Sequence, residues 1–208
     1  MPKIKICGIR RQQDISYVNK YLPEYIGFIF AESKRRVFPD TAAKLVEELD
    51  PKIAKVGVFV NESIDTVVSV SNECCLDVVQ IHGDETPQYI VELKEKLYTN
   101  NPDIKVWKAI RVKDSESLAG MKEYEVDAYV LDSFVEGSYG GSGKTFDWNL
   151  AREARSFGKV VLAGGLDSYN AWQAVAKVQP CIIDISSGVE TDGYKDENKI
   201  REFINTVR

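Results

Sequence analysis

The sequence has few of the residues that build metal centres, disulfide frameworks or membrane segments. Its 208 residues include one histidine and four cysteines, and the cysteines show no CxxC spacing. Cys74 and Cys75 are adjacent, which does not suit the geometry of a disulfide. No apolar run reaches the roughly 18–20 residues that a membrane span needs, and the N-terminus, MPKIKICGIR, lacks the apolar stretch of a signal peptide. We therefore expect a cytoplasmic protein with no metal and no membrane contact.

The chain also lacks an excess of positive charge. Its formal net charge is −5, with 44% apolar and 28% charged residues. A negative net charge argues against nucleic acid as a general partner. The length fits one α/β domain, and no change in composition or low-complexity segment marks a boundary. We expect residues 1–208 to form a single domain.

Short apolar, β-branched runs alternate along the chain with segments of helical periodicity. Runs of this kind are typical of parallel strands that are covered by helices. The predicted strands are Lys3–Cys7, Tyr25–Phe30, Ala54–Val60, Leu76–Ile81, Ile104–Ala109, Asp127–Asp132, Lys159–Ala163 and Cys181–Ile185.

Three of the intervening segments place apolar residues at positions i, i+3, i+4 and i+7, which predicts helices with one buried face. These sets are Ala42, Leu45, Val46 and Leu49; Ala171, Ala174, Val175 and Val178; and Ile200, Phe203, Ile204 and Val207. Asp40 and Ser168 are the predicted N-caps of the first two helices.

Eight strand–helix units predict a closed (β/α)8 barrel with parallel strands, and a doubly wound open sheet is the alternative. In both folds, functional residues lie beyond the C-terminal ends of the strands. The polar and glycine-rich segments do follow strands in this sequence: CGIR, ESKRR, HGDE, DSFVEGSYGGSGKTF, GGLDS and SSGVE.

Cys7 and Asp132 end two predicted strands and are candidates for proton transfer. Their structural interpretations are a buried apolar cysteine and a carboxylate that accepts hydrogen bonds from a loop. A thiol with an ordinary pKa of about 8.5 is mostly protonated at pH 7, so Cys7 as a base needs a nearby cation or helix N-terminus. Asp132 as an acid needs surroundings that stabilise its protonated form, such as burial or a nearby thiolate.

Small residues after the last two strands indicate a phosphate site. Glycine and serine let backbone N–H groups approach phosphate oxygens, and barrels often bind phosphate with the loops after strands seven and eight. Ordinary turns are the alternative. The residues concerned are Gly164, Gly165, Ser186, Ser187 and Gly188.

Three further features have a structural and a functional interpretation. The basic run Lys34–Arg36 is either a solvated surface or the source of an arginine that binds a carboxylate. Gln80 and His82 share one strand face; His82, the only histidine, is either structural or, with Gln80, a candidate to contact a substrate. The segment Gly140–Lys144 does not have P-loop spacing and is either a surface loop or a lid.

These segments together resemble phosphoribosylanthranilate isomerase, in order and over nearly the whole chain. The matching segments are KICGI at 5–9, GFIF at 27–30, SKR at 33–35, VGVFV at 56–60, QIHGDE at 80–85, GGSGKTFDW at 140–148, LAGGL at 162–166, DISSGVE at 184–190 and GYKD at 193–196. The chain differs from the family pattern at Ala31–Glu32, where the family has a longer segment, and Arg36 follows Arg35.

The resemblance implies an Amadori rearrangement of a small phosphoribosyl substrate, with Cys7 as general base and Asp132 as general acid. It implies no cofactor or metal, because the imine intermediate is itself the electron sink. It places the substrate arginine at Arg35, with Arg36 as the alternative. A monomer is expected, with a homodimer as the alternative. Two rival functions are the related sugar-phosphate isomerase of histidine biosynthesis, which has an aspartate in place of Cys7, and a phosphoribosyl-binding module without turnover.

Overall fold

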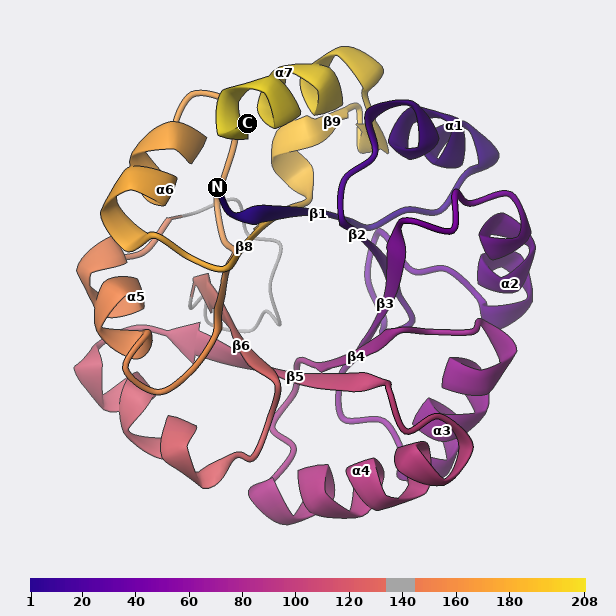
Figure 1. Ribbon diagram of the computed structural model, residues 1–208, viewed down its shortest axis with the longest axis vertical. Helices are drawn as coiled ribbons and strands as arrows, with labels where there is room; N and C mark the ends of the chain where they lie inside the picture. The colour runs from indigo at the N-terminus through magenta and orange to yellow at the C-terminus, as the bar shows by residue number, and fades with distance from the viewer. Residues whose placement is uncertain (134–144) are drawn as a thin grey trace.

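The computed structural model describes residues 1–133 and 145–208. Its eight parallel strands form a closed barrel in sequence order, and the helices surround them (Figure 1). Because the last strand pairs with the first, the predicted (β/α)8 barrel is confirmed and the doubly wound alternative is wrong. The segment Gly140–Lys144, which we interpreted as a surface loop or lid, lies outside the described residues.

The barrel strands agree with the predicted runs to within a few residues. They are β1 (Lys3–Cys7), β2 (Tyr25–Ile29), β3 (Ala54–Phe59), β4 (Val78–Ile81), β5 (Lys105–Val112), β6 (Ala128–Ser133), β7 (Val160–Leu162) and β8 (Ile182–Ile185). The largest difference is in β5, which continues past the predicted end at Ala109. It does so because Arg111 and Val112 stay in register with Asp132 and Ser133 of β6.

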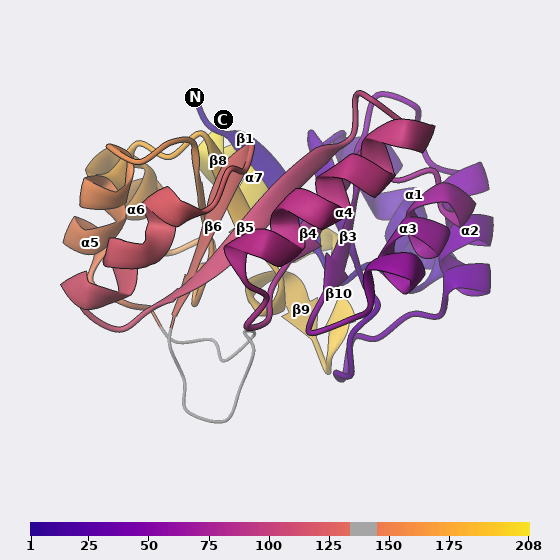
Figure 2. The ribbon, with the colours of Figure 1, turned by 90° about the horizontal axis from the view of Figure 1, so that it is seen from below.

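One helix follows each barrel strand. They are α1 (Gln12–Tyr21), α2 (Pro39–Glu47), α3 (Ile64–Glu73), α4 (Pro87–Asn100), the 3-10 helix η1 (Ser115–Glu123), α5 (Trp148–Ala154), α6 (Ala171–Val178) and α7 (Glu197–Val207). Between β8 and α7 lie a short 3-10 helix, η2 (Ser187–Val189), and a hairpin of β9 (Glu190–Thr191) and β10 (Tyr194–Lys195). In Figure 2 this hairpin lies at the end of the barrel opposite the chain termini.

Both predicted N-caps are wrong. Helix α2 begins after Phe38 with Pro39 at its first position, so Asp40 lies inside the first turn. Proline suits that position because its missing N–H has no partner in a helix. Helix α6 begins after Asn170, and Asp167, rather than Ser168, accepts the N–H groups of Tyr169 and Asn170.

The core has two parts, separated by the alternation of side chains along the strands. One part fills the barrel interior and includes Val56, Trp107 and Val130. The other lies between the strands and the helices, and it contains Ile4 and Ile6 of β1. Lys5 and Cys7 alternate with these isoleucines, so β1 presents a charged residue and a thiol to the barrel interior.

None of the helices in residues 1–133 and 145–208 has both the length and the apolar character needed to cross a bilayer. The four cysteines are all free thiols.

Replacing Phe203 with alanine tests the helical layer. Its ring is fully buried on α7, so Phe203→Ala should lower the free energy of unfolding by about 3–5 kcal/mol, measured by urea denaturation. The exposed neighbour Glu202 gives the control, because Glu202→Ala should change this free energy by no more than about 0.5 kcal/mol. Equal losses in the two variants would contradict the packing of α7.

Candidate active site

A cavity of about 660 Å³ opens at the C-terminal ends of the barrel strands, within the size range typical of ligand sites. The predicted site residues that line it are Cys7, Arg35, Gln80, His82, Asp132, Gly164, Gly165, Ser186 and Ser187. The structure thus brings together residues from three strands, β1, β4 and β6, and from the segments that follow β2, β4, β7 and β8. Gly188 is the one predicted phosphate residue that is not among those lining the cavity. It packs against the loop after β7, where an added Cβ would lie 2.0 Å from the carbonyl oxygen of Leu166.

Cys7 lies at the end of β1, where Gly27 of β2 leaves room for its side chain. A Cβ on Gly27 would be 2.7 Å from the Cys7 sulfur. On the other side, the hydroxyl of Ser186 donates to the carbonyl oxygen of Cys7 at 3.0 Å. The thiol is buried and yet borders the cavity.

The expectation that Cys7 has a cation nearby agrees with the structure, but the net effect is opposite to what a base requires. Burial raises the pKa of Cys7, Lys5 and Lys195 lower it, and Asp184 raises it. The resulting pKa is higher than that of an ordinary thiol. With its pKa raised, Cys7 is mainly protonated near neutral pH.

Asp132 is the penultimate residue of β6 and faces the same cavity. Its Oδ1 accepts the N–H of Ser133 at 2.8 Å, and its Oδ2 lies 3.5 Å from Nε2 of His82. The amide nitrogen of Gln80 is 3.0 Å from Nδ1 of His82. With that amide as donor, the neutral imidazole carries its proton on Nε2, facing Asp132. Gln80 and His82 therefore form a row that leads to the carboxylate.

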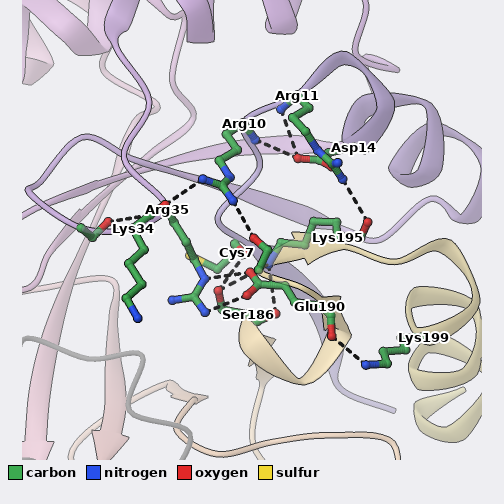
Figure 3. Close-up of polar contacts among 12 residues, drawn as sticks. Cys7, Arg10, Arg11, Asp14, Lys34, Arg35, Ser186, Glu190, Lys195 and Lys199 are labelled. Atoms are coloured by element: carbon green, nitrogen blue, oxygen red, sulfur yellow. Dashed lines mark hydrogen bonds and ion pairs between the residues drawn. The ribbon is translucent and has the colours of Figure 1, made fainter.

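The two candidate arginines have different surroundings. Arg35 borders the cavity, and its Nε and Nη2 donate to the two carboxylate oxygens of Glu190 at 2.7 and 2.8 Å (Figure 3). Arg36 is more exposed and pairs with Glu32 at 2.9 Å. Its guanidinium also lies over the ring of Phe38. The position of Arg35 therefore favours it as the ligand of a substrate carboxylate.

Sequence reasoning missed a group of charges beside Cys7. Lys195 of β10 is buried and donates to Glu190 at 2.7 Å and to the carbonyl oxygen of Ser186 at 3.0 Å. Figure 3 shows Glu190 between Lys195 and Arg35, close to Cys7. Both Glu190 and Lys195 fall in matched segments, at 184–190 and 193–196, but they had no assigned role.

A second missed pair lies deeper in the barrel. Lys5 donates to Asp184 at 2.7 Å, and both side chains are buried. A signal for them exists in the sequence, since each is a charged residue within an otherwise apolar strand, KIKIC and IIDI. Charges at such positions are rare unless they are paired.

The predicted phosphate segments line one wall of the cavity. Gly164 and Gly165 both have positive φ, at +85° and +62°, a conformation that favours glycine. Ser186 and Ser187 follow from β8, the neighbouring strand. Within the described part of the chain, no group of three or more His, Cys, Asp or Glu side chains is arranged to hold a metal ion.

Comparison with known proteins identifies the family. The family model for N-(5′-phosphoribosyl)anthranilate (PRA) isomerase matches residues 4–206. The chain belongs to this family. It is therefore an isomerase of tryptophan biosynthesis.

Relatives of this family cover the chain over its whole length. The N-(5′-phosphoribosyl)anthranilate isomerase of Acetivibrio thermocellus is 53% identical over 210 residues, which cover 100% of this chain and 96% of that protein. A crystal structure of the Thermotoga maritima isomerase has a TM-score of 0.85 and 35% identity, and covers 100% of this chain and 98% of that one. Another isomerase was solved with reduced 1-(o-carboxyphenylamino)-1-deoxyribulose 5-phosphate; its TM-score is 0.83, with 32% identity and coverage of 100% and 98%.

The space that Gly27 leaves for Cys7 can be tested by adding one methyl group. Gly27→Ala should destabilise the fold by about 1–3 kcal/mol and lower turnover, because the new Cβ must displace the Cys7 sulfur. Urea denaturation and steady-state kinetics measure the two effects. Gly120→Ala is the matched control, since among the described residues no atom beyond its chain neighbours and its own helix backbone lies within 4 Å of its added Cβ. A Gly27→Ala variant as stable and active as Gly120→Ala would show that Cys7 does not need this space.

Proposed function

We propose that this chain, acting as a single domain, converts N-(5′-phosphoribosyl)anthranilate to 1-(2-carboxyphenylamino)-1-deoxyribulose 5-phosphate by an Amadori rearrangement. The observation that carries the proposal is the shared cavity, which Cys7 and Asp132 border from two different strands. Family membership supports the choice of substrate. A relative solved with a reduced form of this product shows that the family's barrel accepts such a ligand.

Asp132 acts as the general acid in the first step. It donates a proton to the ribose ring oxygen, the bond between that oxygen and C1′ breaks, and the nitrogen lone pair forms a protonated imine. His82 lies 3.5 Å from the carboxylate and limits its rotation. Asp132 is buried at the wall of the cavity, where its carboxyl group can reach the ring oxygen of a bound substrate.

Cys7 acts as the general base in the second step. Its thiolate removes the proton from C2′, and the electron pair of the C–H bond forms the C1′–C2′ double bond of an enolamine while the imine nitrogen becomes neutral. The enolamine then gains a proton at C1′ and loses one from the 2′-hydroxyl to give the ketone. The imine accepts the electrons, so this chemistry requires no metal or organic cofactor. A positioned acid or base typically contributes about 10²–10⁴-fold to the rate.

Binding groups lie on both sides of this pair. Arg35 binds the anthranilate carboxylate, and Gln80 and His82 contact the substrate beside Asp132. Gly164, Gly165, Ser186, Ser187 and Gly188 bind the phosphate. Binding energy from the phosphate and the carboxylate, both remote from the reacting carbons, holds C2′ at the base.

The assembly and location also belong to the proposal. We propose a monomer that works in the cytoplasm, with a homodimer as the alternative. The Thermotoga maritima relative is described as a dimeric enzyme from which monomers were generated, so sedimentation of the purified protein is needed to decide for this chain.

Removing the acid or the base should abolish turnover without abolishing binding. Cys7→Ala and Asp132→Asn should each lower kcat by at least about 10²–10⁴-fold, measured by the loss of anthranilate-ligand fluorescence. Both variants should still bind the reduced product. A near-normal kcat in either variant would show that the replaced residue is not the general base or the general acid. Turnover of the histidine-pathway substrate by the wild type would favour the sugar-phosphate isomerase of histidine biosynthesis. Binding without any turnover would favour a phosphoribosyl-binding module.

The two adjacent arginines provide a matched pair of variants. Arg35→Ala should raise KM by about 10–100-fold, the loss expected for hydrogen bonds between charged groups, with a smaller effect on kcat. Arg36→Ala should leave KM near the wild-type value, because Arg36 is not among the residues that line the main cavity and its side chain pairs with Glu32. The reverse result would assign the carboxylate to Arg36.

A further inference from the structure

Directly below Cys7, the barrel interior contains the buried ion pair of Lys5 and Asp184. The two residues are register partners on β1 and β8, and their side chains meet at 2.7 Å. Lys5 is fully buried, and Asp184 is 7% exposed where it borders the cavity. Because Lys5 and Cys7 are two positions apart on β1, their side chains point to the same side of the strand. The ammonium therefore lies between the thiol and the apolar interior.

Stability alone does not explain this pair. Most of the interior is filled by apolar side chains, such as Val56, Val130 and Ile182. A buried ion pair loses much of its Coulomb attraction to desolvation, and apolar residues of similar size often give equal or greater stability. A charged pair at this depth therefore calls for an explanation other than packing.

Lys5 is charged in this environment. Burial alone would lower the pKa of Lys5, but the charge of Asp184 and its hydrogen bond, together with Cys7 in its thiolate form, outweigh burial and raise this pKa. The ammonium is thus a positive charge that acts on both the carboxylate and the sulfur.

Asp184 is the less compensated of the two carboxylates near Cys7. Glu190 receives hydrogen bonds from both Arg35 and Lys195. Asp184 receives one from Lys5 through Oδ2, while its buried Oδ1 has no hydrogen-bond partner among the described residues. A buried polar atom without a partner is unusual and costly, so the negative charge of Asp184 is only partly neutralised.

The charges around Cys7 come from several elements. Lys5 lies on β1, as Cys7 does, Asp184 lies on β8, Lys195 on β10 and Arg35 in the segment after β2. Each of these groups acts electrostatically on the Cys7 thiol or on one of the cations near it. Lys195 and Arg35 share Glu190 as counterion. His82, which directly follows β4, and Asp132 of β6 face the same cavity. Lys5 and Asp184 are the two groups of opposite sign whose effects on Cys7 compete directly below it.

We propose that Lys5 and Asp184 are positioning residues that set the ionisation of Cys7 in opposite directions: the ammonium stabilises the thiolate, and the carboxylate opposes it. The catalytic meaning of this inference rests on the proposed role of Cys7 as base. Burial and the charge of Asp184 together keep Cys7 mainly protonated, and any compensation of the Asp184 charge leaves Lys5 free to stabilise the thiolate.

The test measures thiolate formation at Cys7 directly, by its ultraviolet absorbance as the pH is raised. The background carries Cys74→Ala, Cys75→Ser and Cys181→Ser, and the same protein with Cys7→Ala serves as the blank. In this background Lys5→Met should raise the pKa of Cys7 by about 1 pH unit or more, and Asp184→Asn should lower it by a similar amount. The pH dependence of kcat should move with the thiol in each variant.

Lys108→Met is the matched control. Lys108 is also a buried lysine in an ion pair, with Glu85 at 3.3 Å, but it is on β5 and is not among the charges that act on Cys7. Its loss should destabilise the protein and leave the pKa of Cys7 unchanged. A purely structural role for Lys5 and Asp184 would give the same result as this control.

The proposal would be overturned if Lys5→Met and Asp184→Asn moved the pKa of Cys7 in the same direction, or by no more than Lys108→Met does. Should Lys5→Met fail to fold, the nearly isosteric Asp184→Asn decides alone, and an unchanged or higher pKa of Cys7 would refute the proposal. If the two variants changed the pKa of Cys7 in opposite directions while the pH dependence of kcat stayed the same, the roles of Lys5 and Asp184 would be supported. The proposed role of Cys7 as general base would then be rejected. The two proposals can therefore fail separately.

Discussion

The parallel pairing of β1 with β8 closes the barrel, and the rest of the structure depends on it. The register joins Lys3 through Ile6 to Ile182 through Ile185. Without it, both strands would be sheet edges with unpaired backbone groups. The same register places Lys5 beside Asp184 and lets Ser186 reach the carbonyl oxygen of Cys7. The strand pairing that closes the barrel therefore also fixes the surroundings of the thiol.

The positive and negative side chains of the site nearly neutralise one another. Arg35 and Lys195 share Glu190, Lys5 pairs with Asp184, and these pairs surround a thiol whose burial favours the neutral form. In a region of low dielectric constant, each pair has a large effect on its neighbours. A substrate that carries a carboxylate and a phosphate enters this set as a further charged member. On the proposed mechanism, its arrival would change the ionisation of the site as well as fill it.

Much of the scaffold could be predicted from local pattern. The apolar runs predicted the strands, and the spacing of Ile200, Phe203 and Ile204 predicted a helix with one buried face, which α7 confirms. The errors came where short-range chemistry competes. Asp40 and Ser168 are good capping residues by type, but Pro39 and Asp167 begin the turns instead. The residue that begins a helix depends on where the preceding strand ends and on how the chain leaves it.

The sequence by itself determined the order of strands and helices, the end of the barrel at which the cavity opens, and the motifs that identify the family. Only the tertiary structure decided which charges surround Cys7 and which arginine borders the cavity. The physical reason is separation along the chain: Lys5 and Asp184 are 179 positions apart, and Arg35 and Glu190 are 155 apart. Strand and helix periods report which face of an element is buried. Partners across the barrel are set by its closure and register, which no local pattern encodes.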